Sequence, residues 1–143
     1  MASNLKYAVF GGGSWATAIV KMLAENVESI LWWLRNDDII AHIQKFGHNP
    51  NYISSAEFNV NQLFLSSDIN EMVKYADILI FAIPSAFVKA ELDKINLDLS
   101  SKIVVSAIKG IIPESGLIVG EHFNKKLDIP IENIVVITGP CHA

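Results

Sequence analysis

Three consecutive glycines, Gly11 to Gly13, are the feature that most constrains how this 143-residue chain can fold. An apolar stretch that favours a strand, 5–10, precedes them, and a stretch with apolar residues at helical spacing, 17–25, follows. Gly11, Gly13 and Ala16 fit the pattern G-x-G-x-x-G/A. Gly11 permits a tight turn off the strand, Gly13 lets a ligand approach the backbone, and the small Ala16 lets the helix pack close to the strand.

This arrangement predicts a site for the pyrophosphate of a dinucleotide cofactor. The helix after the glycines begins with free backbone N–H groups and a partial positive charge, and both attract phosphate. Ser14 and Trp15 lie in its first turn, so we expect their N–H groups to face the pyrophosphate. The alternatives are a glycine turn without a ligand, Ser14 as an ordinary helix cap, and Trp15 as a core aromatic.

Apolar strand-like stretches alternate with amphipathic stretches along the whole chain. The predicted strands are 5–10, 29–34, 63–65, 78–83, 102–108 and 134–137. Predicted helices lie between them, the later ones capped by Asn36 or Asp37, by Asp68 and by Ser85, and the last one following Pro113. This alternation implies right-handed crossovers. We therefore expect one α/β domain over residues 1–143, a Rossmann-type doubly wound fold with a mainly parallel sheet of about six strands and helices on both faces.

The composition of the chain indicates which classes of partner it does not bind and in which cellular compartment it is expected. Hydrophobic residues make up 51% of the chain, which suits a sheet buried on both faces. The net charge is −4 without a basic cluster, so we expect neither nucleic acid nor a membrane as a partner. The single cysteine excludes an internal disulfide, and the chain lacks a signal peptide and a membrane-spanning run, so we expect a cytoplasmic protein. The four histidines lack metal-ligand spacing, so we expect no metal site.

Candidate ligand residues lie directly after the predicted strands. Ligands of open parallel sheets bind at the carboxyl ends of the strands. The residues at that edge are Gly11 to Trp15, Arg35, Pro84-Ser85, Lys109-Gly110 and Gly139-Pro140. Because these positions share one edge, a single cofactor can contact several of them.

Six short stretches match the pattern of one family in the correct order. They are 11–18 (G-x-G-S-W-G-T-A), 33–35 (tryptophan and arginine after the second strand), 48–52 (N-P-x-Y), 83–85 (V-P-S), 106–111 (S-x-x-K-G-I) and 139–143 (G-P-S-x-A). The chain thus resembles the N-terminal domain of bacterial-type NAD(P)-dependent glycerol-3-phosphate dehydrogenases. It departs from the pattern at Ala16, where glycine is usual, at Cys141, where serine is usual, and at 53–56, where the family has proline and glycine.

The resemblance implies an NAD(P)-dependent oxidoreductase that interconverts sn-glycerol 3-phosphate and dihydroxyacetone phosphate. It implies contacts to NAD or NADP from Gly11, Gly13, Ser14, Trp15, Arg35, Pro84, Lys109 and Ala143. It also implies contacts to the phosphorylated substrate from Lys109, Gly139 and Cys141. In the family a helical substrate domain follows and carries a catalytic lysine, so we expect no catalytic residue within 1–143 and no activity from this part alone. Association with further copies of the chain stays open.

Other interpretations of these residues compete with the family roles. Lys109 is also explained as a solvated lysine at a strand end. Arg35 can pair with a 2′-phosphate, stack on adenine, or form a surface pair with Asp38. Asp37 or Asp38 can accept from the ribose 2′-OH of NAD if the second strand ends two residues later than predicted. We do not expect covalent catalysis by Cys141, because a neighbouring histidine in sequence does not place a base on the thiol.

Two other functions are compatible with a dinucleotide-binding domain. One is a two-domain dehydrogenase that acts on another 2-hydroxy or 2-oxo compound. The other is a dinucleotide-sensing domain without turnover.

Overall fold

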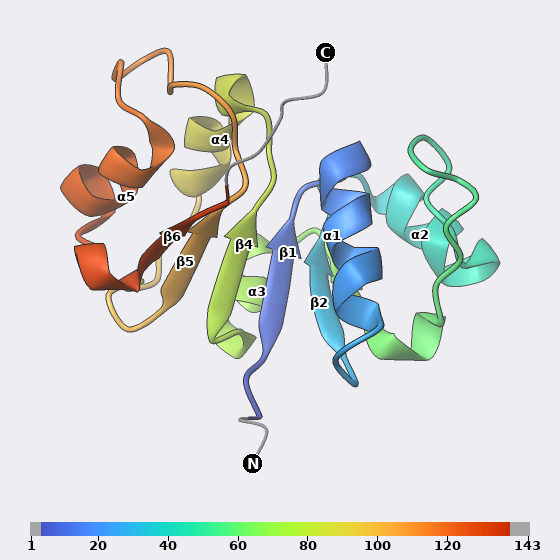
Figure 1. Ribbon diagram of the computed structural model, residues 1–143. Coiled ribbons are helices and arrows are strands. Elements are labelled where there is room, and N and C mark those ends of the chain that lie inside the picture. Colours follow the sequence, from blue (N-terminus) through green and yellow to red (C-terminus); the bar gives the residue numbers. More distant parts are fainter. Residues whose placement is uncertain (1–3, 138–143) are drawn as a thin grey trace.

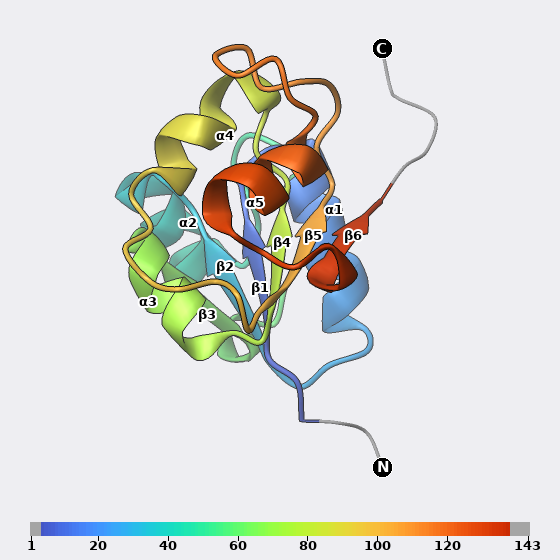
Figure 2. The same ribbon diagram turned by 90° about the vertical axis from the view of Figure 1, so that its left-hand side faces the viewer.

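The computed structural model of the chain describes residues 4–137, and its core is a parallel sheet. The strand order is β3-β2-β1-β4-β5-β6, which confirms the doubly wound fold class expected from the sequence (Figures 1 and 2). The strands are β1 (Tyr7–Phe10), β2 (Ile30–Trp33), β3 (Leu63–Ser66), β4 (Ile78–Phe81), β5 (Ile103–Ser106) and β6 (Ile134–Val136). Because the order reverses between β1 and β4, the loops after these two strands diverge and leave room for a ligand at the switch point.

Helices cover both faces of this sheet, as the sequence predicts (Figures 1 and 2). The helices are α1 (Ser14–Ala24), α2 (Asp37–Phe46), α3 (Ile69–Tyr75), α4 (Ser85–Leu92) and α5 (Val119–Leu127). Apolar residues of α1 and α2 pack with Val9, Trp32 and Ile80 on one face. Those of α3, α4 and α5 pack with Phe10 and Phe81 on the other. None of the helices in residues 4–137 has the length and apolar character needed to cross a membrane.

Side-chain caps fix where two of these helices, α2 and α3, begin. The side chain of Asn36 accepts from the N–H of Asp38 and starts α2, and α2 ends at Gly47. The side chain of Asp68 accepts from the N–H groups of Asn70 and Glu71, in the first turn of α3, as its spacing to Glu71 predicts.

Two helix starts differ from the predictions. Ser85 is the first residue of α4 and does not cap it, because Pro84 holds the cap position. Ser14 lies in the first turn of α1 as predicted, but Gly13 holds the cap position, so the alternative of Ser14 as a helix cap is wrong. The last helix begins at Val119 rather than shortly after Pro113. Residues 111–118 form a turn closed by an antiparallel bridge between Ile111 and Ile118. Gly116 has a φ of +67°, a conformation that a helix cannot continue through.

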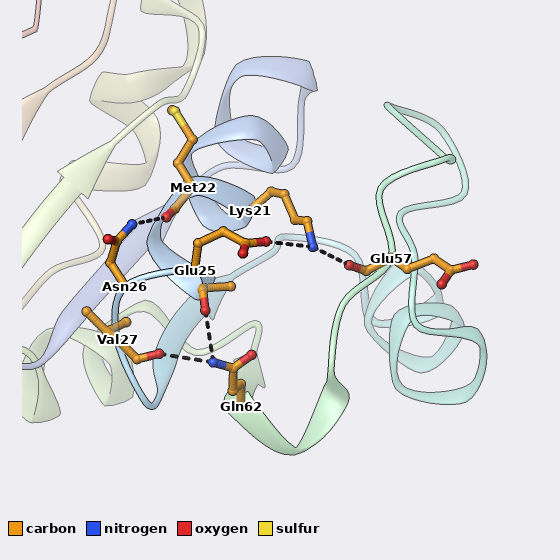
Figure 3. A network of polar contacts seen from close by, with 8 residues as sticks. Lys21, Met22, Glu25, Asn26, Val27, Glu57 and Gln62 are labelled. Carbon is orange, nitrogen blue, oxygen red and sulfur yellow. Dashed lines mark hydrogen bonds and ion pairs between the residues drawn. The ribbon is translucent and has the colours of Figure 1, made fainter.

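The long connection after α2 is held against the end of α1 (Figure 3). Lys21 of α1 donates to the backbone carbonyl of Glu57 at 2.9 Å and pairs with Glu25 at 3.2 Å. The side chain of Gln62 donates to the carbonyl of Ala24, the last residue of α1, and to that of Val27 just beyond the helix. The connection therefore has a defined path, which brings residues 48–52 back towards the glycine turn.

Candidate functional site

The glycine turn between β1 and α1 is shaped by close backbone contacts. Gly11 has a φ of +137°, and a Cβ at this position would lie 2.4 Å from the carbonyl oxygen of Ala82. Its N–H donates to the carbonyl of Trp33 at 3.2 Å, and its own carbonyl accepts from the buried indole N–H of Trp32 at 2.8 Å. Gly11 thus joins the carboxyl ends of β1, β2 and β4 at a spacing that only glycine permits.

Gly13 has open space around it, whereas Gly11 is crowded by neighbouring backbone. Gly13 is the cap residue of α1 with φ −82° and ψ −173°, and a Cβ built there would meet nothing within 4 Å. No side chain caps the helix at this end, so the first N–H groups of α1 stay available to a ligand. Open space in front of a helix N-terminus is what a pyrophosphate requires, so these residues fit a dinucleotide.

Ser14 and Trp15 flank this open space on the first turn of α1. Both are exposed, and Trp15 retains 46% of its accessible surface. The interpretation of Trp15 as a core aromatic is therefore wrong. An exposed indole beside a helix N-terminus leaves a flat apolar surface next to the proposed phosphate position.

Asn49 is a structural residue of the site to which the sequence assigned no role. Its side chain is fully buried and donates to the carbonyl of Gly12 at 3.1 Å and to the hydroxyl of Thr17 at 2.9 Å. The Thr17 hydroxyl in turn donates to the carbonyl of Gly13 at 2.7 Å. These bonds hold the carbonyls of Gly12 and Gly13 in place. The family-like stretch 48–52 was the signal that pointed to this residue.

The loops after β4 and β5 lie next to each other at the same edge of the sheet. Gly110, with a φ of +95°, approaches Ser85, since a Cβ on Gly110 would lie 3.5 Å from the Ser85 hydroxyl. Pro84 and Lys109 are exposed on these two loops, and within residues 4–137 Lys109 forms no ion pair. Lys109 thus lies on the loop next to the one that carries the predicted cofactor residue Pro84, and its side chain is exposed.

Arg35 lies after β2 and is exposed. Strand β2 ends at Trp33, earlier than predicted, and Asp37 and Asp38 form the first turn of α2. The condition under which either aspartate would take the acidic role, a later end of the strand, is therefore not met. In the described part of the chain, Arg35 forms no ion pair with Asp38 or with another acidic residue.

Three predicted site residues, Gly139, Cys141 and Ala143, lie outside the described residues. The last described residue, Ile137, donates its N–H to the carbonyl of Ser106 at 2.8 Å. Ser106 is the last residue of β5. Across residues 4–137, no three histidine, cysteine or acidic side chains gather as a metal-binding group would require.

Comparisons with known proteins agree with this geometry. The family described as NAD-dependent glycerol-3-phosphate dehydrogenase N-terminus matches residues 6–143. Among curated relatives, glycerol-3-phosphate dehydrogenase [NAD(P)+] of Oceanobacillus iheyensis is 31% identical over 140 residues, covering 96% of this chain and 40% of the relative. The enzyme of the same name from Staphylococcus aureus is 33% identical over 141 residues, covering 96% of this chain and 42% of the relative.

Solved structures show the same fold. A glycerol-3-phosphate dehydrogenase from Coxiella burnetii superposes with a TM-score of 0.78 at 22% identity, covering 95% of this chain and 41% of that one. The chain thus spans about two fifths of the length of the proteins that it matches. From the family match over residues 6–143, the chain belongs to the family of NAD-dependent glycerol-3-phosphate dehydrogenase N-terminal domains.

Proposed function

We propose that this chain is the cofactor-binding domain of an oxidoreductase that interconverts sn-glycerol 3-phosphate and dihydroxyacetone phosphate. The observation that carries the proposal is the open space at Gly13 in front of an uncapped helix N-terminus. The relatives named glycerol-3-phosphate dehydrogenase [NAD(P)+] support the same activity. A substrate domain with the catalytic lysine would follow residue 143, since the relatives are more than twice as long.

The residues of this chain would bind and orient the cofactor and part of the substrate. Gly11 and Gly13 shape the pyrophosphate site, and the N–H groups of Ser14 and Trp15 donate to the phosphates. Pro84 and Lys109 flank the switch point, where the ammonium group of Lys109 can attract the negative charge of cofactor or substrate phosphate. Gly139, Cys141 and Ala143 complete the site in this proposal. When bound, the nicotinamide supplies the hydride chemistry, and the domain holds it in position.

The direct test is turnover by the full-length protein. We expect it to oxidise NADH or NADPH in the presence of dihydroxyacetone phosphate, because the family match and the names of the relatives point to this substrate. The loss of absorbance of the reduced cofactor measures the rate. Residues 1–143 alone should bind the dinucleotide weakly and transfer no hydride.

Two results would contradict the proposed function. Turnover of unphosphorylated 2-oxo acids, with none of dihydroxyacetone phosphate, would assign the protein to another class of dehydrogenase. Tight dinucleotide binding by a natural full-length protein that turns over neither substrate would assign it to dinucleotide sensing.

We also propose that the enzyme accepts NADP as well as NAD, because Arg35 occupies the position where an NAD-specific site usually has an acidic residue. Its exposed guanidinium can form a bidentate pair with the 2′-phosphate. In the full-length enzyme, Arg35→Ala should raise the KM for NADPH and leave that for NADH nearly unchanged. Loss of one charge-assisted contact costs on the order of 1.5–3 kcal/mol, so the increase should be at least tenfold.

Steady-state kinetics with both cofactors separates the three roles of Arg35. Equal weakening of NADH and NADPH would mean that the guanidinium stacks on adenine and does not select. Unchanged values for both would mean that it is a solvated surface residue.

A further inference from the structure

All three carbonyl groups of the glycine turn accept hydrogen bonds from buried side chains. The donors to the carbonyls of residues 11, 12 and 13 are, in this order, the indole of Trp32 at 2.8 Å, the amide of Asn49 at 3.1 Å and the hydroxyl of Thr17 at 2.7 Å. Each of these three side chains is fully buried. The orientation of the turn is therefore set by side chains from β2, from α1 and from the connection after α2.

The direction of each carbonyl also sets the direction of the N–H group that follows it. In a planar trans peptide unit the C=O and the N–H point to opposite sides. Because the carbonyl of Gly12 points towards Asn49, the N–H of Gly13 points away from Asn49. Within residues 4–137, the N–H groups of Gly12 and Gly13 donate to no backbone carbonyl, so they remain available to a ligand.

The turn needs such support because consecutive glycines hold their peptide units loosely. Without a Cβ on either side, the peptide unit between Gly12 and Gly13 can flip at little steric cost. A flip would put the carbonyl oxygen of Gly12 where the N–H of Gly13 now points. That oxygen carries a partial negative charge and would repel a phosphate, whereas the N–H attracts one. Phosphate binding therefore requires one of the two orientations.

Asn49 is itself held in one orientation, which makes it a rigid support. Its Nδ2 donates to the hydroxyl of Thr17 at 2.9 Å as well as to the carbonyl of Gly12. Its Oδ1 accepts from the N–H of Asn51 at 3.0 Å, which fixes the plane of the amide. Asn49 and Thr17 thus form one buried pair that holds the carbonyls of Gly12 and Gly13 together.

We propose, on the basis of the function proposed above, that Asn49 and Thr17 are positioning residues for the pyrophosphate of the dinucleotide. They act through the peptide units of Gly12 and Gly13, whose orientation they fix before the ligand arrives. A site that is already oriented binds more tightly, since no ordering is required on binding. The pyrophosphate is common to NAD and NADP, so the pair supports both cofactors alike.

The test is a calorimetric titration of NADH and NADPH into the full-length protein, at a temperature at which every variant is folded. Asn49→Leu removes both donors at nearly constant volume, and Thr17→Val removes the hydroxyl at constant shape. Each should weaken the binding of both cofactors by about tenfold, because one peptide unit of the turn loses its support. Thr17→Ser keeps the hydroxyl and should bind both cofactors as the wild type does.

Gln62 provides the matched control for a merely structural effect. Its side-chain amide also donates to two backbone carbonyls, at the opposite end of α1 from the glycine turn (Figure 3). Gln62→Met keeps the length of the side chain and loses both bonds. It should lower the melting temperature and leave both dissociation constants unchanged.

Several results would overturn the positioning role. One is wild-type affinity in folded Asn49→Leu or Thr17→Val; if Asn49→Leu does not fold, Thr17→Val alone decides. Another is a loss in Gln62→Met or Thr17→Ser as large as the loss in Thr17→Val. A loss confined to NADPH would also contradict it, because the effect would then lie at the 2′-phosphate. A folded wild type that binds neither cofactor would instead contradict the proposed function itself.

Discussion

Replacing Gly11 by alanine should destabilise the protein by roughly 3–5 kcal/mol, the range of the most damaging single substitutions. The added Cβ would lie 2.4 Å from the carbonyl oxygen of Ala82 and 3.3 Å from the Cβ of Ala16. Neither neighbour can move cheaply, because one is backbone at the end of β4 and the other is buried in the contact between α1 and the sheet. The φ of +137° adds strain for any residue with a side chain.

Gly13→Ala is the matched control two residues away. A Cβ on Gly13 meets nothing within 4 Å and its φ is −82°, so the free energy of unfolding should change by no more than about 1 kcal/mol. Urea unfolding of the two variants and of the wild type measures both effects. A loss of less than about 1 kcal/mol for Gly11→Ala would mean that β1, β4 and α1 do not meet as described.

Hydrophobic runs made most of the fold predictable. Five of the six strands lie within their predicted stretches, and the third, Leu63–Ser66, extends one residue beyond its stretch. The predicted strands are too long because apolar residues continue past the last ladder pair. Ile83 follows β4 and is 6% exposed, so it belongs to the core without belonging to the sheet. Periodicity detects burial and does not distinguish these two cases.

The start of α5 was predicted wrongly for a related reason. Leu117, Ile118 and Val119 continue the apolar pattern of the helix backwards along the chain. Only Val119 of the three is in the helix, because the positive φ of Gly116 ends the preceding turn and residues 111–118 close on themselves. Local backbone geometry outweighed the pattern at this point.

The sequence predicted at which edge of the sheet the candidate site lies, but it did not predict the residues that hold the site in place. The rule that ligands bind at the carboxyl ends of parallel strands placed Gly13, Pro84 and Lys109 correctly at one edge. The contact between Asn49 and the carbonyl of Gly12 joins residues 37 positions apart, and periodicity carries no information about such a bond. The exposure of Trp15 likewise depends on which neighbours cover α1, which only the tertiary structure determines.

The second large effect is expected for Gly13→Asp, which should weaken cofactor binding strongly while leaving the stability of the fold nearly unchanged. Aspartate is among the best helix cap residues, and Gly13 holds an extended cap position without a side-chain bond. The free energy of unfolding of Gly13→Asp should therefore lie within about 0.5 kcal/mol of the wild-type value or slightly above it. Its carboxylate would occupy the open space in front of α1 and repel a pyrophosphate there. The affinity for a dinucleotide should fall by on the order of 100-fold, or about 2.7 kcal/mol.

Gly13→Asn distinguishes charge from bulk in this experiment. Asparagine has nearly the same shape and caps helices equally well, but it carries no negative charge. It should weaken dinucleotide binding less than aspartate does. Equal losses for both variants would assign the effect to filled space rather than to repulsion.

Calorimetric titration of NADH and NADPH into the full-length wild type and into Gly13→Asp tests the central claim, that the pyrophosphate lies in front of α1. We expect the wild type to bind, and we expect the variant to lose about two orders of magnitude in affinity while keeping its melting temperature. An unchanged dissociation constant for Gly13→Asp would contradict the claim, as would a folded wild type that binds neither dinucleotide.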